Sequence, residues 1–231
     1  MKPYYKNELT TIYNGDCLEV MDYLIEQGIK VDAIITDPPY GMSFKSNARK
    51  EKHKIIANDN NLKWLPNAFK KYNEILKNNS SLFVFCSWHN IDIFKIEFEK
   101  YFKLNNILVW DKKGNGMGDL ESSFGGTYEL CLFGMKGKKK LNGSRDRDVI
   151  YSNRTGNELH PTQKPTDLIQ YLIEKITIKN DLILDGFSGS FTTSVACEQL
   201  GRRSIGIELE EKYCDIGIDR LQSLQMRLDI W

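Results

Sequence analysis

The chain has 231 residues, of which 41% are hydrophobic and 27% are charged, and its formal net charge is +1. Its length fits one large domain, and its composition is that of an ordinary globular protein, which excludes a low-complexity or repeat protein. No apolar run approaches the ~20 residues of a membrane span, the first residues lack the apolar stretch of a signal peptide, and five scattered cysteines form no CxxC pair, so we expect a cytoplasmic protein without disulfides or a metal site.

The first half of the chain alternates strands with helices. A β-branched run predicts a strand over 10–13, and the spacing of apolar residues predicts a helix over 18–27. A buried strand over 31–36 ends at Asp37-Pro38-Pro39-Tyr40, and the polar, aperiodic stretch over 41–62 is typical of a functional or mobile loop. The other elements predicted here are a helix over 63–77, a strand over 81–86, a helix over 90–101 and a strand over 106–110.

The second half begins with two irregular stretches. Residues 112–127 are rich in glycine and residues 136–159 are basic, with a predicted strand over 128–135 between them. The elements predicted after them are a helix over 163–177, a strand over 182–184, a helix over 192–200, a strand over 204–207 and a helix over 211–228. Strands that alternate with helices predict an α/β domain with a mostly parallel sheet and helices on both faces.

The turn Asp37-Pro38-Pro39-Tyr40 has unusual chemistry for the end of a strand. Two successive prolines cannot continue the ladder and make the turn rigid. The turn therefore holds a carboxylate, the Pro38 carbonyl and an aromatic ring beside one another. Two acceptors and a stacking ring suit a planar heterocycle with an amino group, and flipped bases are held in this way. The alternative is a plain strand terminator.

A second unusual turn spans residues 185–190 and leads into the helix predicted from Thr192. Its small residues let the backbone approach a ligand, and the helix N-terminus favours an anion. Glu208 follows the next strand about 20 residues later, where an acid can bind a ribose diol. The pattern indicates a nucleoside-containing cofactor, although a plain strand–turn–helix connection would have similar residues. A complete GxGxxG is absent, which argues against a nicotinamide-dependent oxidoreductase.

Together these residues resemble the β class of DNA amino-methyltransferases, which act on adenine N6 or cytosine N4 and carry circularly permuted motifs. Asp37 to Tyr40 match the catalytic motif of that family in full. The loop 185–190 is similar to its cofactor loop, residues 160–165 to the segment that opens its cofactor half, and Asn14-Gly15-Asp16 to its acidic turn near the cofactor adenine. The resemblance covers residues 10–221, with the catalytic motif first and the cofactor loop last.

The resemblance implies a single Rossmann-like methyltransferase domain with a seven-stranded sheet and S-adenosylmethionine as cofactor. The implied catalytic residues are Asp37, Pro38, Pro39 and Tyr40. Asp37 and the Pro38 carbonyl would hold the target amino group, Tyr40 would stack on the extruded base, and an initial Asp favours adenine N6 over cytosine N4. The residues implied at the cofactor are Asp16, His160, Thr162, Lys164, Asp185, Phe187, Ser188, Gly189, Ser190 and Glu208.

The resemblance also implies double-stranded DNA as the partner, with no membrane and no metal. A small target-recognition region would occupy residues 112–159, and the basic loop 41–62 would close over the flipped base, so binding should weaken steeply with salt. A homodimer and a cognate restriction endonuclease are further partners that the family admits. The residues expected at DNA are Lys45, Arg49, Lys50, Lys52, Lys112, Lys138, Lys139 and Arg145.

The cofactor loop departs from the family pattern at three positions. Gly186 stands where the family usually has proline, Ser190 where it has glycine, and Phe191 is bulkier than the usual residue. If the turn requires a positive φ at Ser190, the strain would cost about 1–2 kcal/mol and weaken cofactor binding. A non-catalytic nucleic-acid-binding protein that keeps the fold is therefore one alternative, and an N4-cytosine methyltransferase is another.

Overall fold

The structure is a computed structural model that describes residues 1–42, 60–114, 121–156, 159–160 and 162–228. The strands in these ranges are β1 (Tyr5–Lys6), β2 (Thr10–Asn14), β3 (Val31–Thr36), β4 (Leu76–Cys86), β5 (Lys103–Asp111), β6 (Tyr128–Lys136), β7 (Val149–Tyr151), β8 (Leu182–Asp185) and β9 (Arg203–Glu208). The helices are α1 (Cys17–Glu26), α2 (Leu65–Ile75), the short 3-10 helix η1 (Trp88–Asn90), α3 (Ile91–Glu99), α4 (Thr166–Ile176), α5 (Thr192–Gln199) and α6 (Glu211–Leu228).

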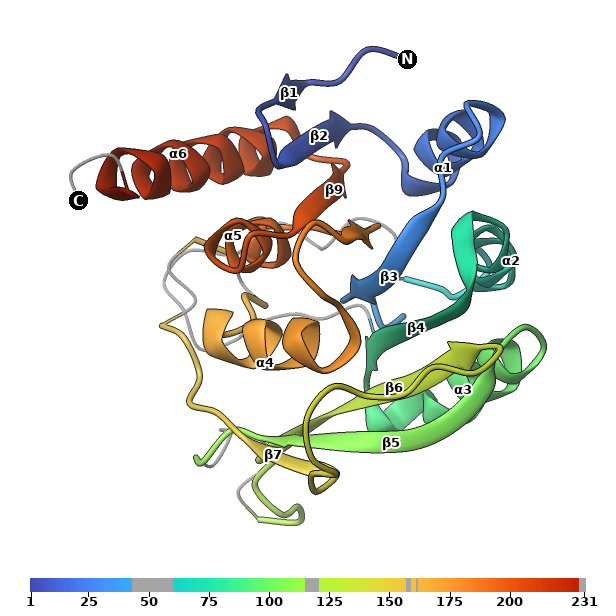
Figure 1. Cartoon of the computed structure of the whole chain (residues 1–231). Coiled ribbons are helices and arrows are strands. Elements are labelled where there is room, and N and C mark those ends of the chain that lie inside the picture. The colour runs from blue at the N-terminus through green and yellow to red at the C-terminus, as the bar shows by residue number, and fades with distance from the viewer. Residues whose placement is uncertain (43–59, 115–120, 157–158, 161, 229–231) are drawn as a thin grey trace.

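The strands form one mixed sheet with the order β1-β2-β9-β8-β3-β4-β6-β5-β7 (Figure 1). The five strands from β2 to β4 in this order run parallel, whereas β6 is antiparallel to both β4 and β5. The α/β class and the mostly parallel sheet are confirmed, but the described residues hold nine strands instead of the expected seven. The two additional strands, β1 and β7, are two and three residues long and form the edges of the sheet.

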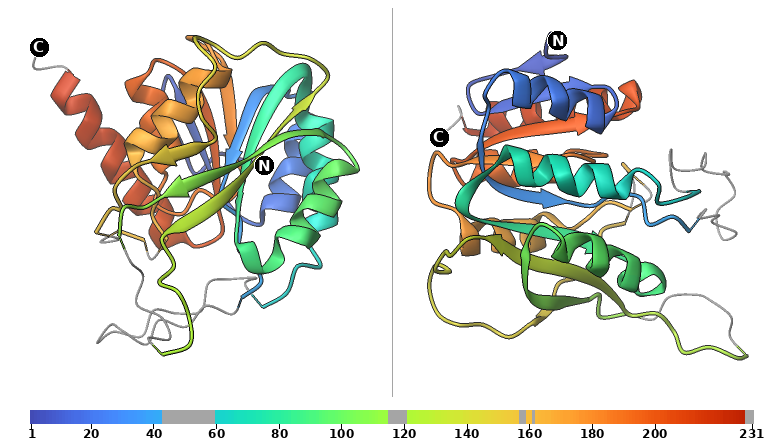
Figure 2. Two further views of the ribbon diagram at one scale, coloured as in Figure 1. Left: turned by 90° about the horizontal axis from the view of Figure 1, so that it is seen from below. Right: turned by 90° about the vertical axis from the view of Figure 1, so that its right-hand side faces the viewer.

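Helices cover both faces of the sheet, as the views in Figure 2 show. Helices α1, α2 and α3 pack on one face, and α4 and α5 pack on the other, with α6 beside α5. Strand β3 is buried on both faces because its side chains alternate: Ile34 lies in the core under α1 to α3, and Ala33 and Ile35 lie under α4 and α5. This explains the near-continuous apolar run that identifies β3 in the sequence.

Helix α4 begins at Thr166, later than the start at residue 163 that the sequence predicts. Pro165 has φ −63° and ψ 137° and precedes the helix in an extended conformation. A residue that precedes proline avoids the helical region, so Lys164 stays outside the helix. Gln163 and Lys164 therefore lie on an extended segment that runs past the carboxyl ends of the strands, where both line the cleft described below.

Strand β4 begins directly after α2, five residues earlier than the sequence predicts. Its first part, Leu76–Ser80, is polar apart from Leu76 and carries no alternating pattern, but Leu76 pairs with Val31 and Ser80 with Lys136.

No helix among the described residues is long and apolar enough to cross a membrane.

Candidate active site

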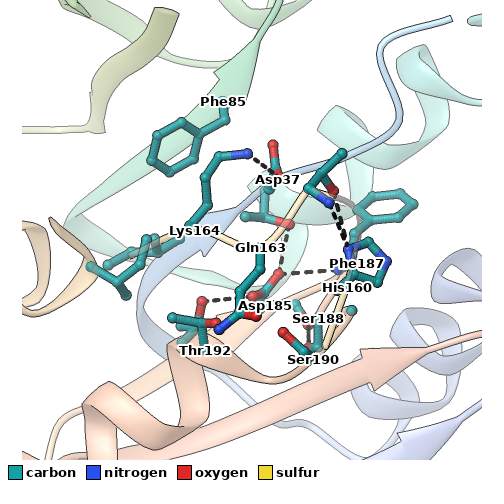
Figure 3. A pocket seen from close by; sticks show the side chains of 16 residues that line it. Asp37, Phe85, His160, Gln163, Lys164, Asp185, Phe187, Ser188, Ser190 and Thr192 are labelled. Atoms are coloured by element: carbon teal, nitrogen blue, oxygen red, sulfur yellow. Dashed lines mark hydrogen bonds and ion pairs between the residues drawn. The ribbon is translucent and has the colours of Figure 1, made fainter. Parts of the chain in front are cut away.

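The two unusual turns of the sequence lie side by side at the carboxyl edge of the sheet. Strands β3 and β8 are neighbours, and the strand order reverses between them, because β4 follows on one side and β9 on the other. Ligands in open α/β sheets bind at such a switch point. The Thr36 Oγ1 atom donates to Asp185 Oδ1 at 3.0 Å and joins the two strand ends directly. A cleft of about 440 Å³, partly open to solvent, runs between the turns (Figure 3).

Asp37 projects into this cleft from the end of β3. The Tyr40 hydroxyl donates to Asp37 Oδ1 at 2.6 Å, and the Asn90 side chain donates to the Tyr40 carbonyl at 2.6 Å. Burial raises the pKa of Asp37 above its ordinary value, and the neighbouring Lys164 ammonium opposes that effect. The Asp-Pro-Pro-Tyr turn thus places a buried acceptor against the cleft, as the sequence predicts.

Lys164 reaches Asp37 from the segment before α4, and Figure 3 shows its ammonium directed at that carboxylate. Its side chain is only 6% exposed, and its Nζ also lies 3.1 Å from Glu129 Oε2. The other oxygen of Glu129 accepts Lys112 Nζ at 2.5 Å. The resemblance places Lys164 at the methionine end of the cofactor; it does line the cleft, but its charge is paired with the Asp37 carboxylate.

Asp185 fixes the cofactor loop from within. Its Oδ2 accepts the Thr193 hydroxyl at 2.7 Å, and its Oδ1 accepts the Phe187 backbone N–H at 3.1 Å in addition to Thr36. Burial raises the pKa of Asp185 to about 6. Three donors around one carboxylate hold the loop against the first turn of α5.

The loop turns at Gly189, which has φ +49°. A Cβ atom at Gly189 would lie 3.4 Å from the His160 ring, so glycine serves both the backbone conformation and the close approach of His160. The His160 ring packs edge-on against Tyr213, with the centroids 4.5 Å apart. The Thr162 hydroxyl oxygen lies 3.2 Å from His160 Nδ1.

Glu208 closes the loop from the end of β9. Its Oε2 accepts the Gly189 N–H at 2.8 Å, and its Oε1 accepts the Glu210 N–H at 2.9 Å. Burial raises the pKa of Glu208 to about 7. The neighbouring strand end carries Asp16, whose Oδ1 caps α1 by accepting from Leu18 N at 2.8 Å. Asn14 donates to the Glu208 carbonyl at 3.1 Å and keeps the two strand ends together.

The three departures in the cofactor loop each have a structural partner. A Cβ at Gly186 would lie 2.7 Å from the Tyr72 hydroxyl, so the larger residue of the family pattern would not fit beside Tyr72. The strain expected at Ser190 is absent, because the left-handed residues of this turn are Gly189 and Phe191, the latter with φ 60°. Ser190 instead accepts Arg220 Nη1 through its carbonyl and hydroxyl oxygens.

The comparison with known proteins agrees with this geometry. The family described as DNA methylase (N6_N4_Mtase) matches residues 31–219. The chain belongs to this family. It is 34% identical over 218 residues to the putative methylase YubD of Escherichia coli (strain K12), covering 94% of this chain and 92% of the relative. It is 30% identical over 258 residues to the type II methyltransferase M2.MboI of Moraxella bovis, covering 97% and 92%.

Solved structures of DNA methyltransferases share the fold of this methylase. The M1.HpyAVI–SAM complex matches with a TM-score of 0.75 and 30% identity, covering 92% of this chain and 99% of that chain. The cytosine-N4-specific PvuII DNA methyltransferase also has a TM-score of 0.75, at 19% identity over 95% of this chain and 88% of its own, and supports the fold alone.

The basic residues expected at DNA fall into three groups in this methylase. Lys45, Arg49, Lys50 and Lys52 lie outside the described residues. Lys112 is only 13% exposed and is paired with Glu129. Lys138, Lys139 and Arg145 are not brought to the carboxyl edge of the sheet. The first two follow the end of β6, where Lys136 pairs with Ser80 in the first part of β4. Arg145 lies in the loop that Asn142 ties to the C-terminus of α4.

Several site residues are invisible to motif reading. Glu129 lies at the second position of strand β6, directly before the apolar residues 130–135, and an acid beside that run is the one local signal that could have revealed it. Asn90 carries no signal of its own, because its contact with Tyr40 joins segments 50 residues apart. The cleft is further lined by Thr36, Phe85, Gln163, Ile169, Thr192 and Thr193. No metal-binding cluster of His, Cys, Asp or Glu occurs in the described part of the chain.

Proposed function

We propose that this methylase transfers a methyl group from S-adenosylmethionine to N6 of an adenine extruded from double-stranded DNA. One observation carries the proposal: the Asp-Pro-Pro-Tyr carboxylate and the loop from Asp185 to Ser190 line one cleft at the switch point of the sheet. A methyl donor and an amino acceptor must meet within van der Waals distance, and this cleft is where the two turns converge.

The residues around the loop fit the cofactor. Glu208 is an acceptor for the ribose diol, and its present partners are two backbone N–H groups. The left-handed Gly189, the adjoining His160 and Thr162, and the N-terminus of α5 suit the amino and carboxylate groups of the methionine end. The bound cofactor supplies an electrophilic methyl group.

The chain's own residues act on the base. Asp37 accepts a hydrogen bond from the target amino group, which directs the nitrogen lone pair toward the cleft. In the present structure the Tyr40 hydroxyl occupies Asp37 Oδ1, so the incoming amino group takes the place of that hydroxyl. The freed Tyr40 ring then stacks on the extruded base. Catalysis consists of positioning the base and of a buried acceptor, Asp37, prepared at the cleft.

Adenine is the favoured base. The motif begins with Asp37, and the chain is 26% identical over 256 residues to the DNA adenine methyltransferase YhdJ of Escherichia coli (strain K12). Cytosine N4 is the second candidate, since the matched family, N6_N4_Mtase, is named for both positions. Both reactions would use Asp37 as the hydrogen-bond acceptor for the amino group, so only the identity of the modified nucleoside distinguishes adenine from cytosine methylation.

We assign target recognition to the β5–β6 connection, residues 112–127, which begins at the carboxyl edge beside Glu129. Residues 137–148 begin at the opposite edge of the sheet. We therefore leave them out of the target-recognition region, which the sequence predicts over residues 112–159. Type II methyltransferases are among the relatives, so we also propose a cognate restriction endonuclease as a partner. The homodimer stays a prediction, which light scattering of the purified protein tests.

The test is transfer of labelled methyl from S-adenosylmethionine to unmethylated genomic DNA, followed by digestion to nucleosides and mass detection. We expect label in N6-methyladenine. Label in N4-methylcytosine would keep the mechanism and change the base. A folded protein that labels no DNA from several sources would favour the non-catalytic alternative.

A further inference from the structure

Four charged side chains form a chain of ion pairs that ends on the catalytic acid. In order they are Lys112, Glu129, Lys164 and Asp37, and each contacts the next. Two are cations and two are anions, so the set is neutral, which offsets the cost of placing each charge away from water. Cofactor binding by Lys164 alone would not require four paired charges. The chain ends at Asp37, which indicates that it acts on that carboxylate.

Glu129 is held as an anion by its two lysines. Burial alone would raise its pKa, but the charges of Lys164 and Lys112 outweigh burial and lower the pKa to about 2. Lys164 is correspondingly held as a cation, because Asp37 and Glu129 raise its pKa although burial opposes them. The Lys164 ammonium also lies 5.0 Å from the centre of the Phe85 ring, which limits the positions open to it.

The two oxygens of Asp37 have different partners. Oδ1 accepts a neutral hydroxyl from Tyr40, which the base can replace, whereas Oδ2 accepts the charged and doubly anchored Lys164. A carboxylate has about four acceptor positions, so Lys164 can stay while the target amino group binds. We propose that Lys164 and Glu129 are positioning residues for methyl transfer, with Glu129 holding Lys164 and Lys164 holding Asp37 ionised and aimed at the cleft. This inference rests on the proposed methyl transfer.

Lys164 and Glu129 have opposite effects on the pKa of Asp37. Asp37 faces Lys164 before α4, Glu129 and Cys131 on β6, Cys86 at the end of β4, Asp185 at the end of β8 and Tyr40 in its own turn. Loss of the Lys164 charge removes the group that lowers the pKa of Asp37, so that pKa rises. Loss of the Glu129 charge removes a group that raises the pKa of Asp37, so that pKa falls.

The experiment compares Lys164→Met, Lys164→Arg and Glu129→Gln with the wild-type protein in the pH profile of kcat for DNA methylation. We expect Lys164→Met to lower kcat at least tenfold at its optimum and to move the acid limb up by at least one pH unit. Glu129→Gln should lower kcat and move that limb down by about half a unit, and Lys164→Arg should restore part of the loss. The matched control is the exposed pair on α3, Lys95→Met and Glu99→Gln, which should change neither quantity.

A second readout does not depend on catalysis. The Asp37 carboxyl can be titrated by carbon-13 NMR in the cofactor-free protein, with its signal assigned from Asp37→Asn, and it should shift in the same two directions. Equal loss of kcat at every pH with no movement of the Asp37 titration would overturn the positioning role, as would wild-type kcat in Lys164→Met. If the wild-type protein methylates no DNA while the NMR shifts appear, the proposed function fails and the ion-pair chain stands. If Lys164→Met does not fold, the kcat profile and the Asp37 titration of Glu129→Gln decide whether the positioning role holds.

Discussion

The Asp37 carboxylate shows how neighbouring groups prepare one side chain for its task. Burial favours its neutral form, while Lys164 favours the ionised form that accepts a hydrogen bond from an amino group. The balance depends on groups from four other parts of the chain. At the scale of single residues, the sequence motif identifies Asp37, and the groups around it determine whether its carboxyl is ionised.

Asp37→Asn should abolish methyl transfer and spare the cofactor site. The amide keeps the size of the side chain but loses a carboxylate acceptor, so kcat should fall at least ~100-fold. The affinity for S-adenosylmethionine should stay within about twofold, because Glu208 and Gly189 lie at the other turn. Labelled transfer measures kcat and calorimetry measures affinity; retained turnover would remove Asp37 from the catalytic role.

Glu208 should make cofactor binding depend on pH. Its pKa is about 7 in the cofactor-free protein, so the side chain is neutral below that pH and a carboxylate above it. A ribose diol donates hydrogen bonds and prefers the carboxylate, so affinity should rise as pH increases to about 7 and then level off. Below that point the loss should approach tenfold per pH unit.

Calorimetric titration with S-adenosylmethionine from pH 5.5 to 8.5 tests this dependence on Glu208. Glu208→Gln should bind more weakly and with a flatter profile, and the neighbouring Glu210→Gln should behave as wild type. Titration of the ligand's own amine is common to all three proteins and cancels in the comparison. Identical profiles for wild type and Glu208→Gln would exclude Glu208 from the site.

At the scale of elements, the cofactor loop is held by the packing of α5 between β9 and α6. Phe191 precedes α5 in a left-handed conformation, fully buried, with its ring against Gly206 of β9 and Gly217 of α6. Arg220 of α6 binds Ser190 at the same turn. The bulky Phe191 is therefore accommodated by two glycines on other elements, and Ser190→Gly should weaken the loop instead of relieving strain.

Gly217→Ala should destabilise the protein although alanine is the better helix former. A Cβ at this position would lie 2.6 Å from Phe191 Cγ, and the ring is fully buried. Overpacking of a core costs about 1–3 kcal/mol, which outweighs the gain of about 1 kcal/mol in helix propensity. Urea unfolding measures the difference. Gly126→Ala, where a Cβ meets nothing within 4 Å, is the control, and a stabilised Gly217→Ala would refute the packing argument.

At the scale of the whole molecule, the two edges of the sheet have different roles. The carboxyl edge carries both turns, the ion-pair chain and the beginning of the β5–β6 connection, whereas Lys138 and Lys139 lie at the opposite edge. Lys138 and Lys139 are thereby separated from the proposed DNA site over Asp37, whereas Arg154, later in the same basic stretch, lies beside Gly126 of the β5–β6 connection. Sequence distance does not reveal this separation, because antiparallel β6 carries the chain from one edge to the other.

The double variant Lys138→Gln/Lys139→Gln should therefore leave DNA affinity and its salt dependence unchanged. Lys50→Gln/Lys52→Gln, in the loop 41–62, should reduce the slope of log K against log salt by roughly one per lysine. Fluorescence anisotropy with a short duplex over a range of salt concentrations gives both slopes. An equal reduction in both variants would show that DNA reaches the far edge.

The sequence by itself determined the class of fold, most of its elements and both unusual turns that line the cleft. Hydrophobic period, turn residues and the Asp-Pro-Pro-Tyr motif are local, so residues within a few positions of one another specify them. The short edge strands β1 and β7 are not predicted, because two and three residues carry no period and gain their pairing only from β2 and β5.

Only the tertiary structure decided which side chains complete the site. Lys112, Glu129 and Lys164 form the chain of ion pairs that ends at Asp37. They come together because strand order brings β5, β6 and the segment before α4 to one edge, and that order is set by packing of whole elements. The conformation of Ser190 was decided in the same way, by Arg220 from α6. Contacts between residues far apart in the chain depend on the assembled sheet, and no local pattern encodes them.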